Sequence, residues 1–358
     1  MFEKTRNWIR DGVDKAYPCA AAAVGCGATV YLREFAGVRQ RKPSALPLTE
    51  DTLFDLASMT KALSTAMIAL KLFEKGALSP DDKLRRHLDI DGNYADVTVS
   101  HLLTHTAGFA PHMPLWRLCE KDECLRVILD SEPLNPVGEA VHYSCLGYIV
   151  LGKLLECVTG KKLDILAREY VFDPLGMKTA CYVPHRNQPY MPVAATEFRR
   201  DLDRRMCGDV HDENAYHMDG VAGNAGVFAT LDDVIAFVTM CALRGRTKDE
   251  EVYLSEKIFA SAIQNRTPDG AESRGYGFQL KGKQPSPLGD AFSFGSYGHT
   301  GFTGTSFYID AKSGLWGILL TNSVYDGRDN RAAYYPHRRQ FYQILEEEFQ
   351  TMRQKGEI

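Results

Sequence analysis

The chain has 358 residues, of which 44% are hydrophobic and 25% charged, a balance that allows a large buried core and two structural lobes. Its net charge of -4 leaves no basic surplus to neutralise phosphates, which argues against a nucleic-acid partner. No apolar run approaches the length of a membrane span, and the first residues lack the apolar core of a secretion signal, so we expect no membrane partner and a cytoplasmic location.

Helical and strand patterns follow one another in blocks along the chain. Residues 3–16 predict an amphipathic helix, and two apolar runs around Gly25-Cys26-Gly27 predict a hairpin. Residues 58–75 predict a helix that ends at Gly76. Further helical patterns cover residues 97–105, 119–131, 144–158, 162–170 and 231–243. Strand patterns cover residues 276–280, 291–299, 304–311 and 315–323, before a last helix at roughly 337–354.

Strand patterns at both ends of the chain, with helical patterns between them, predict an α+β protein. We expect residues 1–85 and 230–358 to build one sheet domain from both termini. Residues 86–229 would form a mostly helical insertion lobe, with the active site in the groove between the two parts.

The segment FDLASMTKAL places Ser58 and Lys61 three residues apart at a predicted helix start. A serine there is often only an N-cap, but residues three apart share a helix face, so Lys61 can lean toward the Ser58 hydroxyl. The apolar neighbours would bury the amine, and burial lowers the pKa of a lysine toward that of a useful base. The pair is therefore a candidate nucleophile and base.

Two later segments complete a pattern. Residues 142–160 offer Tyr143-Ser144-Cys145 at a helix start, and residues 297–310 offer His299-Thr300-Gly301 at the edge of a predicted strand. With Ser58-x-x-Lys61, these resemble the signatures Ser-x-x-Lys, Tyr-x-Asn and Lys/His-Thr-Gly of the serine β-lactamase and penicillin-binding protein family, in its class C and D-alanyl carboxypeptidase/esterase branch.

The resemblance extends over nearly the whole chain, and residues 208–237 are similar to the subgroup of penicillin-binding protein 4B and related cell-wall hydrolases. It implies a β-lactamase/transpeptidase-like fold, in which helices flank an antiparallel β-sheet and an all-helical lobe borders the site. It implies no cofactor and no metal. The oligomeric state stays open.

The resemblance also implies roles for individual residues. Ser58 would form the acyl-enzyme, and Lys61 and Tyr143 would share the proton transfer, with the acylation base left open between them. The backbone N–H groups of Ser58 and Phe302 would form the oxyanion hole. Substrate contacts are expected from the rest of the motif positions and from a glycine-rich segment, namely Cys145, His299, Thr300, Gly301 and Asn224.

Two positions depart from the family pattern. Cys145 stands where the family has asparagine, and a thiol is a weak donor and acceptor. His299 stands where most members have lysine, which would give a cation only partly charged near neutral pH. We therefore expect an amidase, peptidase or esterase acting on small or short-peptide substrates such as D-amino-acid or cell-wall fragments, with weak or no β-lactamase activity. A non-catalytic penicillin- or muropeptide-binding sensor and a true β-lactamase are the alternatives.

Other polar residues allow weaker interpretations. His101 and His105 have a spacing that could bind zinc, and the cluster His211-Asp212-Glu213 could bind metal or substrate, which leaves a metallohydrolase as a third alternative. Nine scattered cysteines without a Cys-x-x-Cys pair predict reduced thiols. Among them, Cys145 could be reactive, because a neighbouring lysine would lower its pKa.

Overall fold

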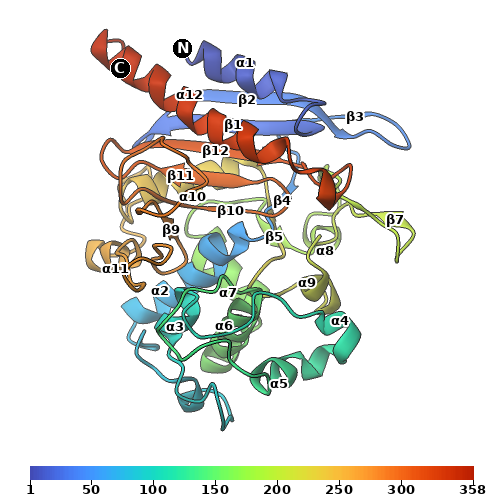
Figure 1. Cartoon of the computed structure of the whole chain (residues 1–358). Coiled ribbons are helices and arrows are strands. Elements are labelled where there is room, and N and C mark those ends of the chain that lie inside the picture. The colour runs from blue at the N-terminus through green and yellow to red at the C-terminus, as the bar shows by residue number, and fades with distance from the viewer.

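A seven-stranded antiparallel sheet forms the upper half of the molecule in the computed structural model, which describes residues 1–329 and 331–358 (Figure 1). Strands from both ends of the chain make up this sheet. In spatial order they are β3 (Leu46–Pro47), β2 (Thr29–Gln40), β1 (Cys19–Cys26), β12 (Leu315–Thr321), β11 (Ser306–Ile309), β10 (Tyr297–Thr300) and β9 (Gln279–Leu280). The pairing of β1 with β12, in which Ala20 lies opposite Thr321, joins the two termini.

Helices cover both faces of the sheet (Figure 1). Helices α1 (Glu3–Asp11) and α12 (Tyr334–Gln354) lie on one face, and α10 (Leu231–Ala242) lies on the other. Buried side chains of β1 alternate between the two cores, with Ala20 and Ala22 facing α12 and Ala21 and Ala23 facing α10. This strand is therefore buried on both faces, as its unbroken apolar sequence predicts.

The middle of the chain forms the lower half, in which helices dominate (Figure 1). Its helices are α3 (Val99–Leu103), α4 (Leu115–Leu118), α5 (Cys124–Leu129), α6 (Cys145–Thr159), α7 (Leu163–Ala167), α8 (Pro184–Asn187) and α9 (Glu213–His217). Short strands also occur beside the site, namely β4 (Phe54–Asp55), β8 (Val227–Ala229) and β5 (Cys181–Tyr182) in one small sheet and β6 (Phe198–Arg199) with β7 (Arg204–Arg205) in another. The domain boundaries at residues 85 and 230 stay a prediction.

The fold class predicted from the sequence is confirmed, while several elements differ in extent. The predicted strand at residues 291–299 is shorter, because β10 begins only at Tyr297 and Phe292 adopts a left-handed backbone with φ of 66°. Helix α11 (Glu256–Ala262) has no counterpart among the predicted elements. Within the described residues, no helix is both long and apolar enough to cross a bilayer.

Candidate active site

A sharp turn presents Ser58 between β4 and the following helix. Ala57 has a φ of 46°, a left-handed conformation that is uncommon for a residue with a side chain, and Ser58 comes next, half-buried. The helix then runs as a π-helical turn over Lys61–Thr65 before α2 (Ala66–Glu74) begins. Such turns are rare and often occur at functional sites.

The ammonium of Lys61 is fully buried and contacts three segments of the chain. Its Nζ lies 3.1 Å from Ser58 Oγ, 2.9 Å from the carbonyl oxygen of Asn224 and 3.6 Å from Cys145 Sγ. The predicted nucleophile and its neighbouring lysine therefore meet, and Cys145 at the start of α6 borders the same nitrogen.

The expectation that burial lowers the pKa of Lys61 is wrong. Burial does act in that direction, but the interactions of the amine with Cys145 and Tyr143 outweigh it, so the pKa of Lys61 is raised above its ordinary value. The raised pKa favours the ammonium form, which donates hydrogen bonds to Ser58 and to the carbonyl of Asn224.

The idea of an activated thiol at Cys145 is also contradicted. Burial raises the pKa of Cys145, and the opposing effect of the Lys61 ammonium does not overcome it. Because the thiolate is the reactive form, Cys145 is less reactive than its position beside a lysine implies.

Tyr143 lies between two cations and two imidazole rings. The Nζ of Lys61 and the guanidinium carbon of Arg274 each lie 5.1 Å from the centre of its ring. The rings of His105 and His299 lie 4.5 and 6.1 Å from it. The structure thus brings together the tyrosine of the second motif, the lysine of the first and the histidine of the third.

His299 is a neutral imidazole rather than a partly charged one. Burial, with Arg274 and Lys61 nearby, holds its pKa well below the ordinary value. Its Nδ1 lies 2.8 Å from the carbonyl oxygen of Thr300, which can only accept, so Nδ1 carries the proton and Nε2 is an acceptor. A buried neutral ring with this tautomer cannot supply positive charge to a substrate carboxylate.

The end of β10 lies directly against the nucleophile turn. Gly301 donates its N–H to the Thr305 carbonyl at 2.7 Å, and a Cβ on Gly301 would lie 2.4 Å from the carbonyl oxygen of Leu56. Only glycine permits this approach. Among the described residues, the backbone N–H groups of Ser58 and Phe302 have no hydrogen-bond acceptor, as an oxyanion hole requires.

The remaining predicted substrate contacts differ in exposure. Thr300 is partly exposed, and so is Cys145. The side chain of Asn224 is fully buried, and its amide has no partner among the described residues, whereas its main-chain carbonyl accepts from Lys61. The structure therefore shows Asn224 at the site chiefly through its backbone.

The buried carboxylate of Asp55 ties the nucleophile turn to a distant loop. It accepts the N–H of Ala57 at 2.8 Å and the N–H of His211 at 2.7 Å. Burial raises the pKa of Asp55 to about 6, although both hydrogen bonds act in the opposite direction. Sequence analysis missed this residue, and an acid at the end of an apolar strand run is the signal that could have found it.

The polar cluster around His211 forms an ion-pair network. His211 Nε2 lies 2.9 Å from Glu197, and Arg328 bonds both Glu197 and Glu213 at 2.7 Å. Asp212 caps α9 by accepting the N–H of Ala215. Within the described residues, the cluster does not form a group of three or more metal-ligating side chains.

The two histidines with zinc-like spacing serve the backbone instead. His101 Nδ1 accepts the N–H of Thr98 and closes a capping box at the start of α3. His105 Nδ1 accepts the N–H of Ser144, the residue before α6, at 3.0 Å. Both rings therefore position helices beside Tyr143.

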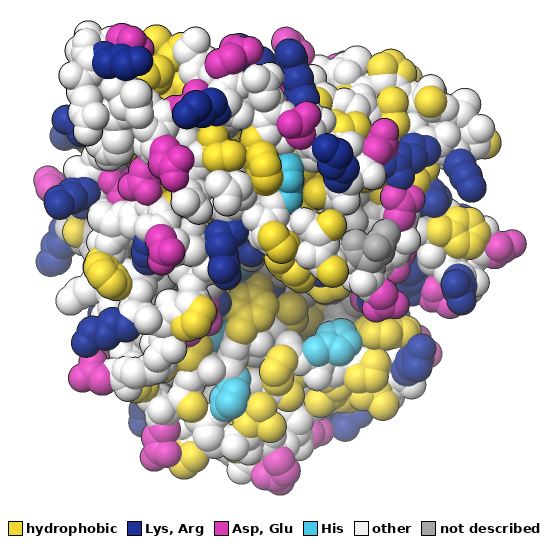
Figure 2. All heavy atoms as spheres, turned by 45° about the horizontal axis from the view of Figure 1, so that its top comes forward, with side chains coloured by type: hydrophobic (Ala, Val, Ile, Leu, Met, Phe, Trp, Pro, Cys, Tyr) yellow, Lys and Arg dark blue, Asp and Glu magenta, His cyan; other side chains and the backbone are white. Residues whose placement is uncertain are grey.

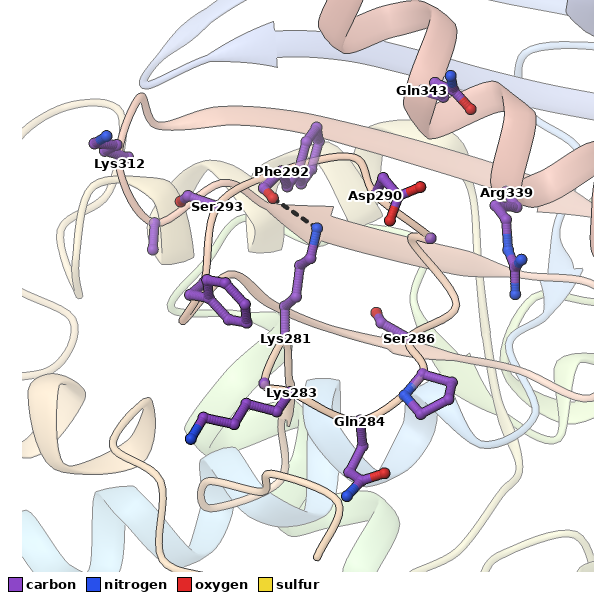
Figure 3. A pocket seen from close by; sticks show the side chains of 15 residues that line it. Lys281, Lys283, Gln284, Ser286, Asp290, Phe292, Ser293, Lys312, Arg339 and Gln343 are labelled. Carbon is purple, nitrogen blue, oxygen red and sulfur yellow. Dashed lines mark hydrogen bonds between the residues drawn. The ribbon is translucent and has the colours of Figure 1, made fainter. Parts of the chain in front are cut away.

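The surface is hollowed between the upper and lower halves of the molecule, with hydrophobic side chains at the floor of the hollow (Figure 2). A separate cavity of about 950 Å³ lies at the other end of β10, under the loop that precedes Tyr297 (Figure 3). There Lys281 is already held by the carbonyl oxygens of Ala291 and Phe292 at 2.6 and 2.8 Å. That cavity contains none of the motif residues.

Arg274 is a second residue that sequence analysis missed. It is buried, holds both oxygens of Glu272 at 2.9 and 2.8 Å, and leaves its Nε without a partner among the described residues. It lies in no recognisable motif, so only the fold reveals that its charge faces Tyr143.

Comparisons with known proteins find similar chains. The Beta-lactamase family model matches residues 5–340. A relative from Escherichia coli K12, named "Putative D-alanyl-D-alanine carboxypeptidase", is 28% identical over 357 residues, covering 88% of this chain and 80% of the relative.

Solved structures show the same fold at lower identity. EstCE1, described as a hydrolase with promiscuous acyltransferase activity, superposes with a TM-score of 0.75 at 20% identity, covering 96% of this chain and 97% of its own. An octameric penicillin-binding protein homologue from Pyrococcus abyssi has a TM-score of 0.72 at 22% identity, covering 92% and 75%.

The pKa of Asp55 leads to a testable dependence of stability on pH. An aspartate in the unfolded chain has a pKa of about 3.9. Between that value and about 6, the folded protein binds one proton more than the unfolded chain, so this group's contribution to stability falls as the pH rises. The free energy of unfolding of wild type relative to Asp55→Asn should therefore decrease between those two pH values, as measured by urea denaturation. The exposed Asp51→Asn serves as control, and a difference that stays constant or increases with pH would contradict the assignment.

Proposed function

The chain belongs to the β-lactamase family, and on that premise we propose that it is a serine hydrolase that forms an acyl-enzyme on Ser58. Its substrates are amides or esters in D-amino-acid-containing or cell-wall-derived peptides. The observation that carries the proposal is the 3.1 Å contact between Ser58 Oγ and the buried ammonium of Lys61. The printed name of the Escherichia coli relative supports a carboxypeptidase, and EstCE1 supports an esterase.

Tyr143 relays the proton during acylation in this proposal. The raised pKa of Lys61 favours its ammonium form, which does not accept the proton of Ser58. As Oγ attacks the substrate carbonyl carbon, its proton passes to the Tyr143 oxygen, while Tyr143 gives its own phenolic proton to the nitrogen or oxygen that will leave. The Lys61 ammonium, 3.1 Å from Oγ, stabilises the developing negative charge on the serine oxygen.

The free N–H groups of Ser58 and Phe302 receive the carbonyl oxygen as it becomes an oxyanion. The bond to the protonated amine or alcohol then breaks, and the ester bond to Ser58 remains. A water molecule attacks this ester and passes a proton to Tyr143, while Tyr143 gives its own proton to Ser58 Oγ, and the acid product is released.

Arg274, rather than His299, contacts a substrate carboxylate in this proposal, with its guanidinium shared between that carboxylate and Glu272. His299 is neutral and its Nε2 is an acceptor, whereas Arg274 is always charged and lies 5.1 Å from the Tyr143 ring. A carboxylate next to the scissile bond is the feature that distinguishes a peptide carboxypeptidase substrate from a neutral ester.

Efficient β-lactam hydrolysis is disfavoured by the group at position 145. Cys145 offers a protonated thiol beside Lys61, and a thiol is too weak a hydrogen-bond partner to orient an acyl-amide carbonyl. The same substitution leaves the contact between Ser58 and Lys61 in place. Hydrolysis of esters and peptides is therefore retained in the proposal, with β-lactams as poor substrates.

Covalent labelling tests the nucleophile directly. A fluorophosphonate should add one adduct to wild type, because Ser58 Oγ is the activated oxygen, and intact-mass spectrometry will count the adducts. Ser58→Ala should show none, whereas Ser44→Ala, which removes an exposed serine, should label like wild type. Labelling of Ser58→Ala at the wild-type rate, or an unlabelled wild type, would rule the proposal out and favour a non-catalytic binding protein.

The role of Arg274 is tested by a peptide and an ester. Arg274→Gln should lower kcat/KM for a D-Ala-D-Ala peptide by about 10- to 100-fold, the loss expected for a charge-assisted hydrogen bond. Hydrolysis of a neutral nitrophenyl ester should fall much less, since it has no carboxylate to bind. Both rates are measured spectrophotometrically, with Arg33→Gln on the far strand β2 as control. Equal losses for the two substrates would mean that Arg274 has only a structural role.

A further inference from the structure

A second buried arginine lies at the oxyanion-hole end of the groove. The guanidinium carbon of Arg331 lies 3.9 Å from the centre of the Phe302 ring and 4.9 Å from that of Tyr335. The ring of Phe302 also stacks on that of His211, with 5.6 Å between the ring centres. Arg331 is therefore held between two aromatic side chains, directly beside the residue whose N–H faces the scissile carbonyl.

This arginine differs from its neighbour in having no acidic partner among the described residues. Arg328 is neutralised by Glu197 and Glu213, each at 2.7 Å. Arg331 is 7% exposed, forms no ion pair with the described residues, and has a buried Nε without a hydrogen bond. Burial, with Arg338 and Arg328 nearby, lowers its pKa. A buried cation without a counter-charge is costly, and an anionic ligand would remove that cost.

The aromatic residues beside Arg331 lie at the molecular surface. The side chains of Phe302 and Tyr335 are 42% and 45% exposed, so the aromatic pair forms part of the surface. The Nε of Arg331 has no hydrogen-bond partner among the described residues. A guanidinium can donate two parallel hydrogen bonds to a carboxylate.

We propose that Arg331, with Phe302 and Tyr335, binds a second carboxylate of the substrate, distinct from the carboxylate near Arg274. This inference rests on the proposed function, because it names the substrate class of the same groove. The preferred substrates are then dianionic acyl peptides, in which one carboxylate contacts Arg274 and the other contacts Arg331. Monoanionic peptides and neutral esters lack the second contact.

The test measures binding to Ser58→Ala protein, so that it does not depend on turnover. Succinyl-, glutaryl- and adipoyl-D-alanine carry two carboxylates, and their terminal amides are matched in size but carry only one. Calorimetry should show that, at one chain length or more, the dianion binds at least about tenfold more tightly than its amide, the usual effect of a charge-assisted hydrogen bond. This preference should disappear in Ser58→Ala/Arg331→Gln and remain in Ser58→Ala/Arg33→Gln, which removes an exposed arginine stacked at 5.9 Å on Phe35.

The outcomes separate this proposal from that of the serine hydrolase. Equal affinity for dianion and amide at every chain length, or no binding of either, overturns the Arg331 site even when a fluorophosphonate labels Ser58. A preference that survives Arg331→Gln but is lost in Arg274→Gln also overturns it. Arg331→Lys keeps the positive charge and should retain part of the preference for the dianion. This variant keeps the proposal testable if Arg331→Gln does not fold. Conversely, a preference that depends on Arg331 stands even when Ser58 proves unreactive.

Discussion

The buried ammonium of Lys61 is the constraint on which the site depends. A charge with no access to water must be surrounded by acceptors. Here they are Ser58, three residues away, and two distant segments, namely the start of α6 at Cys145 and the main chain at Asn224. Placing the lysine therefore fixes the two halves of the molecule relative to each other. The groove between the two halves is thus tied to the hydrogen bonds that one buried cation requires.

Much of the fold and of the candidate site could be predicted from the sequence because both depend on local sequence patterns. The apolar runs of β1 and β12 predict buried strands, and three short motifs in the right order predict the family. The direction of the Lys61 pKa shift could not be predicted, since it depends on how closely the fold brings Tyr143 and Cys145. Arg274 and Arg331 were missed for a similar reason, because isolated arginines in loops carry no pattern.

The departures from the family motifs change the electrostatics of the groove while preserving its geometry. A neutral His299 removes a positive charge that the family pattern usually supplies by lysine, and Arg274 and Arg331 lie beside the rings of Tyr143 and Phe302. In the proposed function, selectivity therefore depends more on loops outside the motifs than on the motifs. This agrees with a family whose fold is shared by proteins described as carboxypeptidase, penicillin-binding homologue and acyltransferase-like hydrolase.

The pairing of β1 with β12 also bears on how the protein is made. During synthesis the nucleophile turn emerges early, yet β1 has no partner until residues 315–321 leave the ribosome. Contacts between such distant parts of a chain form slowly, because a long loop must close before they contribute. Phe302, proposed for the oxyanion hole, also emerges late. The proposed nucleophile Ser58 is therefore synthesised long before the proposed oxyanion-hole residue, and the two come together only when the sheet closes.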